Sequence, residues 1–357
     1  MSQRSIKYVN GQIFTGEQWM SQALITTNNG RIVSVTHNGP ADEVADLKGG
    51  KLVPAFIDLQ LYGGNGLFFG EHPTVEALDA TVAYSRAGGA YLILPTVATN
   101  SNEVAFAAID AVREYWAAGR KGIAGLHLEG PFLNVKKRGA HAADKIQEPT
   151  VTNIRKLVEY GKGIVKMMTI APELFTDEGI KILQDAGIII SAGHSDATYE
   201  QATAAFGKGI QLCTHLYNAM SPLQHRAPGL VGAIFDHPTV MSSIVTDGYH
   251  VDAAAIRIAK KLMGQRLFII TDAVTANPDG HYQHRLEGNR YVMPDGTLSG
   301  SALTMVKAVK YCTEQAGIDE GEALRMASLY PARVLGLDKE WGKIAPGYIE
   351  SLFIIDQ

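Results

Sequence analysis

From residue 52 onward, short apolar runs alternate along the chain with longer segments in which apolar and polar positions follow a helical period. Eight such runs cover residues 52–58, 91–97, 123–129, 164–170, 188–193, 210–215, 240–247 and 267–272. The helix-length segments between them include residues 75–87, 104–118, 151–160, 198–207 and 253–262. This alternation is typical of β-α units with a parallel sheet. Eight units predict an α/β fold, a closed (β/α)8 barrel of the TIM type.

The first fifty residues show a different pattern, in which β-rich runs are joined by tight turns. Asn10-Gly11 and Asn29-Gly30 each stand between two such runs, where Asn-Gly is the strongest short signal for a β-hairpin. An apolar run at residues 352–355 has no helix after it. We therefore expect residues 1–51 and 346–357 to form a small β-sandwich domain from both termini, and residues 52–345 to form the barrel. An open doubly wound sheet is the alternative, but no G-x-G-x-x-G motif follows a strand to support it.

Composition and charge narrow the functional classes. The chain has 357 residues, 46% of them hydrophobic, and a formal net charge of −4. Its 2 cysteines cannot make a disulfide framework, and the N-terminus shows no signal peptide, so we expect a cytoplasmic protein. No segment reaches the roughly 18 consecutive apolar residues of a membrane-spanning helix. Near-neutral charge without a dense basic stripe also argues against a nucleic-acid partner.

Polar residues stand at the C-terminal ends of the expected barrel strands, where barrel enzymes build their active sites. They are Asp58, Gln60, Tyr62, His127, Glu129, His194, His215, Asp247, His250 and Asp272. Glu129, His194 and His215 make a nitrogen and oxygen donor set that suits a borderline divalent metal such as zinc, with an open position for water. One such histidine alone would indicate a hydrogen-bonded strand end, but three strand ends together favour a metal site.

Asp272 follows the apolar run at residues 267–270, where an unpaired carboxylate would be costly to bury. A nearby metal and its water would supply a partner. A carboxylate in that place can take the proton of the water and pass it to a leaving group, so we predict that Asp272 is the general base and acid. A salt-bridged or helix-capping aspartate is the alternative.

Four motifs occur in order along the chain. They are His127-Leu-Glu-Gly-Pro131, Gly193-His-Ser-Asp196, Thr214-His-Leu-Tyr-Asn-Ala-Met220 and Leu298-Ser-Gly-Ser301. On this ordered set the chain resembles the N-acetylglucosamine-6-phosphate deacetylase family, which belongs to the amidohydrolase superfamily. The resemblance runs from about Gly11 to the C-terminus and includes Met326-Ala-Ser-Leu-Tyr-Pro-Ala-Arg333.

The resemblance implies that the protein hydrolyses the acetamide of N-acetyl-D-glucosamine 6-phosphate to D-glucosamine 6-phosphate and acetate, in amino-sugar catabolism. It implies that Glu129, His194 and His215 hold the catalytic metal and that Asp272 is the general base and acid. These roles agree with the interpretation drawn from the residues themselves.

The resemblance also implies roles for substrate-binding residues. His141 would polarise the acetyl carbonyl, and His250 would contact the sugar phosphate. Asn218, the backbone at Ala219, and Arg226 would complete the phosphate site. An arginine offers a rigid fork of donors that suits a phosphate. Arg226 is expected to serve the active site of a neighbouring subunit, which would make the protein a homodimer.

Gln60 and Tyr62 stand where many amidohydrolases carry His-x-His, and neither is a good ligand for a second metal. We therefore expect one divalent ion per subunit, with zinc as the expected metal and iron(II) or another divalent ion as the alternative.

Two other functions stay open on the sequence. A related amidohydrolase that acts on N-acetylgalactosamine 6-phosphate or another N-acyl amide would use the same ligands. A barrel that binds sugar phosphates without catalysis is the second, but such a scaffold would have little reason to carry a charged cluster at its strand ends.

Overall fold

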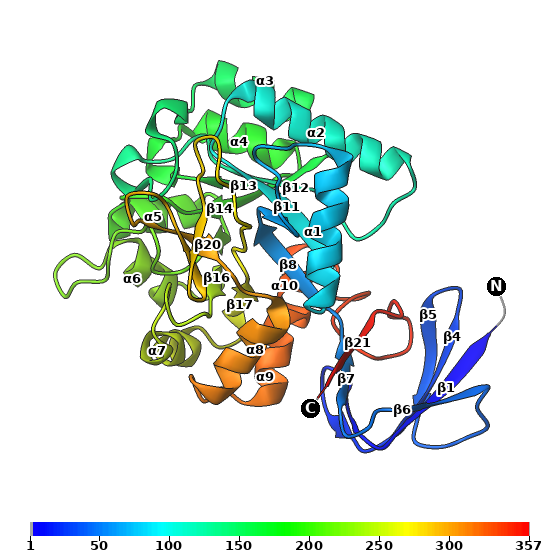
Figure 1. The fold of residues 1–357 in the computed structure, drawn as a ribbon. Helices are drawn as coiled ribbons and strands as arrows, with labels where there is room; N and C mark the ends of the chain where they lie inside the picture. The colour runs from blue at the N-terminus through cyan, green and yellow to red at the C-terminus, as the bar shows by residue number, and fades with distance from the viewer. Residues whose placement is uncertain (1–2, 357) are drawn as a thin grey trace.

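The structure of the protein is a computed structural model that describes residues 3–356. Residues 1, 2 and 357, which the expected small domain includes, lie outside the described residues. Figure 1 shows a large α/β body with a smaller β part beside it, and both termini lie in the smaller part.

The large body is built on one sheet of eight parallel strands. These are β8 (Phe56–Leu61), β11 (Ala90–Ala98), β12 (Leu126–Glu129), β13 (Val165–Ile170), β14 (Ile189–Ala192), β15 (Leu212–Cys213), β16 (Met241–Val245) and β17 (Leu267–Ile270). The first and last strands meet just beyond their ends, where the Asp272 N–H donates to the Gln60 carbonyl at 2.9 Å and the Tyr62 N–H donates to the Ala273 carbonyl at 2.8 Å. The expected (β/α)8 barrel is confirmed.

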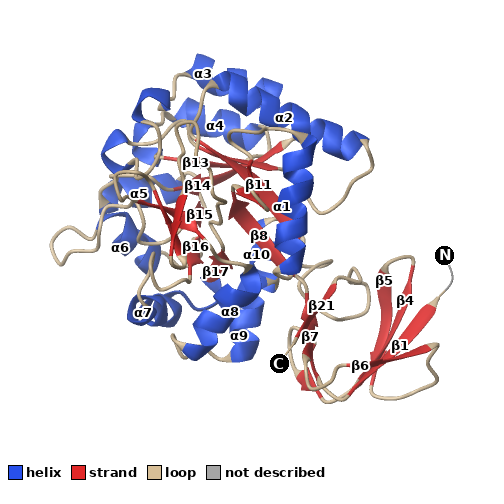
Figure 2. Cartoon of the chain, in the orientation of Figure 1, coloured by secondary structure: helices blue, strands red, loops and turns tan. Residues whose placement is uncertain are grey.

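Helices cover the outside of this barrel (Figure 2). They are α1 (Val75–Ala87), α2 (Asn102–Ala117), α3 (Val151–Tyr160), α4 (Asp177–Asp185), α5 (Tyr199–Gly207), α6 (Gly229–Asp236), α7 (Ala253–Met263), α8 (Met305–Glu314), α9 (Glu320–Ala327) and α10 (Leu329–Val334). The five expected helices begin and end within two residues of their predicted limits. Thr74, Ser101, Thr150, Thr176 and Thr198 set several of these starts, because each side chain accepts a backbone N–H of the first helical turn.

The expected first barrel strand, residues 52–58, is wrong in its extent. The structure divides this run between two sheets, with β7 (Lys51–Pro54) in the smaller part and β8 in the barrel. The chain changes sheet at Ala55, whose N–H donates to the Ser351 carbonyl at 2.9 Å, while the Phe56 N–H donates to the Gly89 carbonyl at 2.8 Å. Hydrophobic periodicity could not mark this boundary because residues 52–57, on both sides of it, are buried and apolar.

The smaller part consists of two four-stranded sheets. One contains β1 (Arg4–Val9), β4 (Ala23–Asn28), β5 (Arg31–Thr36) and β6 (Glu43–Asp46), and the other contains β2 (Gln12–Phe14), β3 (Trp19–Met20), β7 and β21 (Leu352–Ile355). Their buried apolar side chains form a cluster separate from the barrel core. The division of the chain at residues 51/52 and 345/346 stays a prediction.

One of the two expected hairpins is wrong. Asn29-Gly30 joins the antiparallel strands β4 and β5, as expected. Asn10-Gly11 instead carries the chain from one sheet to the other, because β1 pairs with β4 and β6 whereas β2 pairs with β3 and β7. A Cβ at Gly11 would lie 2.5 Å from the Gly50 carbonyl oxygen, so a glycine is needed for this close approach.

Two small sheets stand at the C-terminal mouth of the barrel. One, formed by β9 (Gly63–Gly64) and β10 (Leu67–Phe68), follows β8, and the other, formed by β18 (Arg285–Glu287), β19 (Arg290–Val292) and β20 (Leu298–Ser301), follows β17. In Figure 1, β20 is drawn in gold across this mouth. Within residues 3–356, no helix is long and apolar enough to cross a membrane.

Candidate active site

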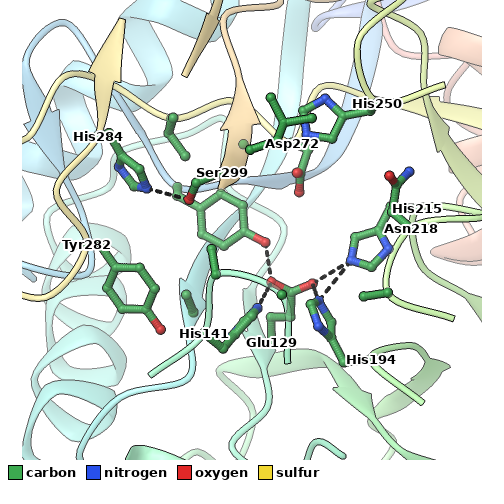
Figure 3. A pocket seen from close by; sticks show the side chains of 18 of the residues that line it. Glu129, His141, His194, His215, Asn218, His250, Asp272, Tyr282, His284 and Ser299 are labelled. Atoms are coloured by element: carbon green, nitrogen blue, oxygen red, sulfur yellow. Dashed lines mark hydrogen bonds and ion pairs between the residues drawn. The ribbon is translucent and has the colours of Figure 1, made fainter. Parts of the chain in front are cut away.

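A pocket at the C-terminal ends of the barrel strands gathers all but one of the residues for which the sequence predicts a catalytic, metal-binding or substrate-binding role (Figure 3). Its lining includes Glu129, His141, His194, His215, Asn218, Ala219, His250 and Asp272. Arg226 is the exception, because its side chain is exposed and borders a separate surface pocket near Asp196. Its expected role in a neighbouring subunit therefore stays a prediction.

Glu129, His194 and His215 bring three donor atoms close together. Nε2 of His194 lies 3.2 Å from Oε1 of Glu129, Nε2 of His215 lies 3.1 Å from the same oxygen, and the two nitrogens are 3.1 Å apart. Donors about 2.0–2.1 Å from a tetrahedral zinc ion stand roughly 3.3 Å from one another. The spacing and chemistry of these three donors therefore fit one divalent ion.

A hydrogen bond from Nδ1 of His194 orients the ring so that its Nε2 can bind such an ion. Its Nδ1 lies 2.9 Å from the backbone carbonyl of Lys137. A carbonyl can only accept, so Nδ1 carries the hydrogen and the Nε2 lone pair faces the Glu129 carboxylate. Burial lowers the pKa of His194 to about 4, which keeps the ring neutral and able to act as a ligand.

His141 also reaches the carboxylate but is oriented as a donor. Its Nε2 lies 3.0 Å from Oε2 of Glu129, and its Nδ1 accepts the backbone N–H of Thr99 at 3.2 Å. In the neutral ring the hydrogen is therefore on Nε2. Glu129, His141 and His194 could also be considered a metal-binding group, since their donor atoms lie within 4.8 Å of one another. The tautomer of His141 favours His215 as the third ligand instead.

Gln60 and Tyr62 lie against the candidate ligands rather than forming a second site. The Tyr62 hydroxyl donates to Oε2 of Glu129, and Nε2 of Gln60 donates to Oε1 of Glu129 at 3.0 Å and to Oδ1 of Asp272 at 2.9 Å. Burial raises the pKa of Glu129, but the neighbouring His194 and His141 more than offset this effect and hold the pKa well below its usual range. No pattern in the sequence indicates that Gln60 links the carboxylate of Glu129 to that of Asp272.

Asp272 stands beside this cluster in an unusual backbone conformation. Its φ is 54°, and His194 and His215 also have positive φ values of 47° and 34°. Such left-handed positions are rare for residues other than glycine and gather at functional sites. Burial raises the pKa of Asp272, and the opposing effect of His215 offsets only part of the rise. A carboxyl group with a raised pKa is suited to exchange protons near neutral pH.

His250 and Asn218 line another part of the pocket, on the side away from Tyr282 and His284 in Figure 3. Nδ1 of His250 lies 2.7 Å from Oδ2 of Asp247, a contact that fixes the ring and leaves its Nε2 free of that carboxylate. Burial raises the pKa of Asp247, but the hydrogen bond and charge of His250 lower it more, so the carboxyl is ionised at neutral pH.

Glu173 connects two loops. One of them carries His194, and the other is the segment before His141. The Glu173 carboxylate accepts the Ser195 hydroxyl at 2.6 Å, the Asp196 N–H at 2.8 Å and the Asn134 side-chain amide at 2.9 Å. No pattern in the sequence marks Glu173, because its three partners lie in two other loops of the chain.

We expect Glu173→Ala to weaken divalent-metal binding about tenfold to a hundredfold, because the loop that orients His194 loses its anchor. A chelator competition on the purified protein measures this affinity. Glu178→Ala is the matched control, since Glu178 makes only an exposed ion pair with Arg155. An unchanged affinity in Glu173→Ala would show that the anchor does not position His194.

Comparisons with known proteins show the family to which the chain belongs. The model of the amidohydrolase family matches residues 52–357. An N-acetylglucosamine-6-phosphate deacetylase from Haemophilus influenzae is 39% identical, with 87% of this chain and 83% of that protein covered. An N-acetylgalactosamine-6-phosphate deacetylase from a Shewanella species is 35% identical, with 94% of this chain and 88% of that protein covered.

Among solved structures, an N-acetylglucosamine-6-phosphate deacetylase from Pasteurella multocida superposes with a TM-score of 0.93 at 34% identity, covering 99% of this chain and 96% of that one. The family match and the buried cluster together support a divalent metal site. The resemblance drawn from the four sequence motifs is confirmed. The chain belongs to the amidohydrolase family of hydrolytic enzymes.

Proposed function

We propose that this enzyme hydrolyses the acetamide of N-acetyl-D-glucosamine 6-phosphate, giving D-glucosamine 6-phosphate and acetate in amino-sugar catabolism. One observation carries the proposal. A single pocket holds a three-donor cluster, an aspartate with a raised pKa beside it, and a separate polar group formed by Asn218 and His250. The deacetylase names of its relatives support the same reaction.

Glu129, His194 and His215 would hold one divalent ion per subunit, and we propose zinc, for which two imidazoles and a carboxylate are suitable ligands. When bound, such an ion supplies the Lewis acidity that makes water a nucleophile at neutral pH. Hydrogen bonds from Tyr62 and Gln60 keep the Glu129 carboxylate oriented.

Asp272 and His141 would carry out the proton transfer and the charge stabilisation. Asp272 accepts the proton of the attacking water and later gives it to the departing amine nitrogen. The Nε2–H of His141 donates to the acyl oxygen as that oxygen becomes negative, with the substrate replacing Glu129 as its acceptor.

We propose that His250, Asn218 and the backbone of Ala219 bind the 6-phosphate, together with Arg226 from the neighbouring subunit of a homodimer. Arg226 is exposed on its own chain and is therefore available to a second copy.

The two cysteines are buried and unpaired, which supports a reducing, cytoplasmic location.

The phosphate should act as a binding handle that orients the acetamide. We expect His250→Ala to lower kcat/KM for the 6-phosphate by about 10- to 100-fold, because a hydrogen bond to a charged group contributes about 1.5–3 kcal/mol. The same substitution should change turnover of unphosphorylated N-acetylglucosamine much less. An equal loss on both sugars would contradict the phosphate role.

Acetate release from N-acetylglucosamine 6-phosphate by the purified protein tests the proposed function, with the galacto isomer and the free sugar measured alongside. Fast, chelator-sensitive release from the gluco isomer would support it. A preference for the galacto isomer would instead select the activity that the Shewanella relative is named for. Metal binding without release from any of the three would contradict the proposal.

A further inference from the structure

One end of the pocket is apolar and separate from the main core. Five side chains there pack on one another as a buried cluster, and all five line the pocket. They are Tyr62, Phe68, Ala98, Val274 and Tyr282, none more than 6% exposed. Figure 3 shows that Tyr282 lies across Glu129 from Asn218 and His250. The pocket therefore has a polar end and an apolar end, with the candidate metal ligands between them.

The hydroxyl groups of the two tyrosines at the apolar end already have partners. The Tyr282 hydroxyl donates to the Thr99 carbonyl at 2.6 Å, and the Tyr62 hydroxyl donates to Glu129. Nε2 of His284, which borders this end, lies 3.0 Å from Oγ of Ser299. A sugar hydroxyl or a phosphate placed among these five side chains would lose its water and find both tyrosine hydroxyls already donating, although the buried Nδ1 of His284 at the border has no hydrogen-bond partner. A hydrocarbon group makes no hydrogen bonds to water and therefore loses none when it enters this end of the pocket.

The charge at this end is also low. His284 packs edge-on against Phe68, with ring centroids 4.9 Å apart, and burial lowers the pKa of His284 to about 4. It is therefore neutral at neutral pH and does not attract an anion.

His141 connects the apolar end to the reacting atoms. Its ring centroid lies 6.4 Å from that of Tyr282 at an interplanar angle of 87°, and its Nε2 lies 3.0 Å from Glu129. Thr99 ties these groups together, because its N–H donates to His141 and its carbonyl accepts from Tyr282. An acyl carbon whose oxygen faces His141 and whose nitrogen faces Asp272 has one substituent left, and the apolar end beside His141 is the part of the pocket that suits a hydrocarbon substituent.

We propose that Tyr62, Phe68, Ala98, Val274 and Tyr282 form an acyl subsite that accepts the acetyl methyl group and excludes longer acyl chains. The proposal rests on the proposed function. In that reaction water adds to the acyl carbon, the C–N bond breaks, the acyl group leaves as a carboxylate, and the amine nitrogen receives both protons of the water and leaves as an ammonium group. The subsite selects which acyl group can undergo this step.

The walls of the acyl subsite have little room to move. A Cβ added at Gly300, where φ is +66°, would lie 2.4 Å from a methyl carbon of Val274, so β20 packs directly on that wall. Phe68 packs against both Tyr282 and His284, with centroid distances of 5.8 and 4.9 Å, and those two rings are 6.2 Å apart. A pocket wall that is packed this closely discriminates between substrates by size.

The test compares N-acetyl- and N-propionylglucosamine 6-phosphate as substrates of the metal-loaded enzyme. Both release the same amine product, so one assay measures both kcat/KM values. One methylene in an apolar pocket changes rates by about 10- to 200-fold, and we expect the wild type to favour acetyl by at least about tenfold. Phe68→Leu and Val274→Ala widen the subsite and should each reduce this preference by about tenfold.

Phe69→Leu is the matched control. Phe69 is fully buried next to Phe68 but belongs to the main core and does not line the pocket. It should keep the wild-type acyl preference, because a ratio of two substrates does not depend on the fraction of folded enzyme. Three results would each overturn the acyl subsite. The wild type could show no preference for the acetyl substrate, both widened variants could keep the wild-type ratio of kcat/KM values, or Phe69→Leu could change that ratio as much as they do.

The same measurements separate the two proposals. If the wild type does not hydrolyse N-acetyl- or N-propionylglucosamine 6-phosphate but cleaves another N-acyl amide, the proposed substrate is wrong. The acyl subsite is then judged by the same ratio on the N-acetyl and N-propionyl forms of that amide. If no amide is cleaved, both proposals are wrong.

Discussion

Asp272→Asn is expected to lower kcat by about 100- to 10,000-fold, the usual contribution of a positioned general base and acid. The amide cannot accept the proton of the attacking water, yet its oxygen can still accept the hydrogen bond that Gln60 now donates to Asp272 at 2.9 Å. We therefore expect the variant to fold and to retain its metal. Steady-state kinetics with the 6-phosphate substrate, together with metal content, measure both effects.

Asp58→Asn is the control for this substitution. Asp58 is also a buried aspartate, but it lies within β8 rather than at the strand end where the sequence predicts it, and its carboxylate accepts from the hydroxyl and N–H of Thr271 and does not line the pocket. It should lose far less activity than Asp272→Asn. Near-normal turnover by Asp272→Asn would assign the proton transfer to another group.

His194→Ala is expected to abolish stable metal binding and, with it, activity. The substitution removes one of three donor atoms that lie 3.1–3.2 Å apart and leaves the Lys137 carbonyl without the imidazole N–H it now accepts. Two remaining ligands and water hold a divalent ion far more weakly than three. Metal content after dialysis, measured by mass spectrometry, should fall from about one ion per chain to almost none.

His284→Ala is the matched control for metal content, since His284 is another buried histidine of the pocket but bonds to Ser299 rather than to the cluster. It should keep its ion. His215→Ala should lose the ion and His141→Ala should keep it, because His141 is placed as a donor. The reverse result would assign the site to Glu129, His141 and His194.

Glu129 and Arg226 illustrate which residues of the site can and cannot be predicted from local sequence patterns. Glu129 and Asp272 could be predicted because each ends an apolar run, and parallel barrel strands bring their C-terminal ends to one face. Arg226 could not be derived in this way. It lies in an exposed loop, and its expected partner is a second copy of the chain.

The sequence by itself determined the alternation of barrel strands and helices and the polar residues at the barrel mouth. These depend on periodicity and on contacts within a few residues. Only the tertiary structure decided that Gln60 joins Asp272 across 212 positions, that Tyr282 reaches Thr99 across 183, and that the run around Ala55 belongs to two sheets. Such contacts form only when the barrel closes, so no local pattern of apolar and polar residues can encode them.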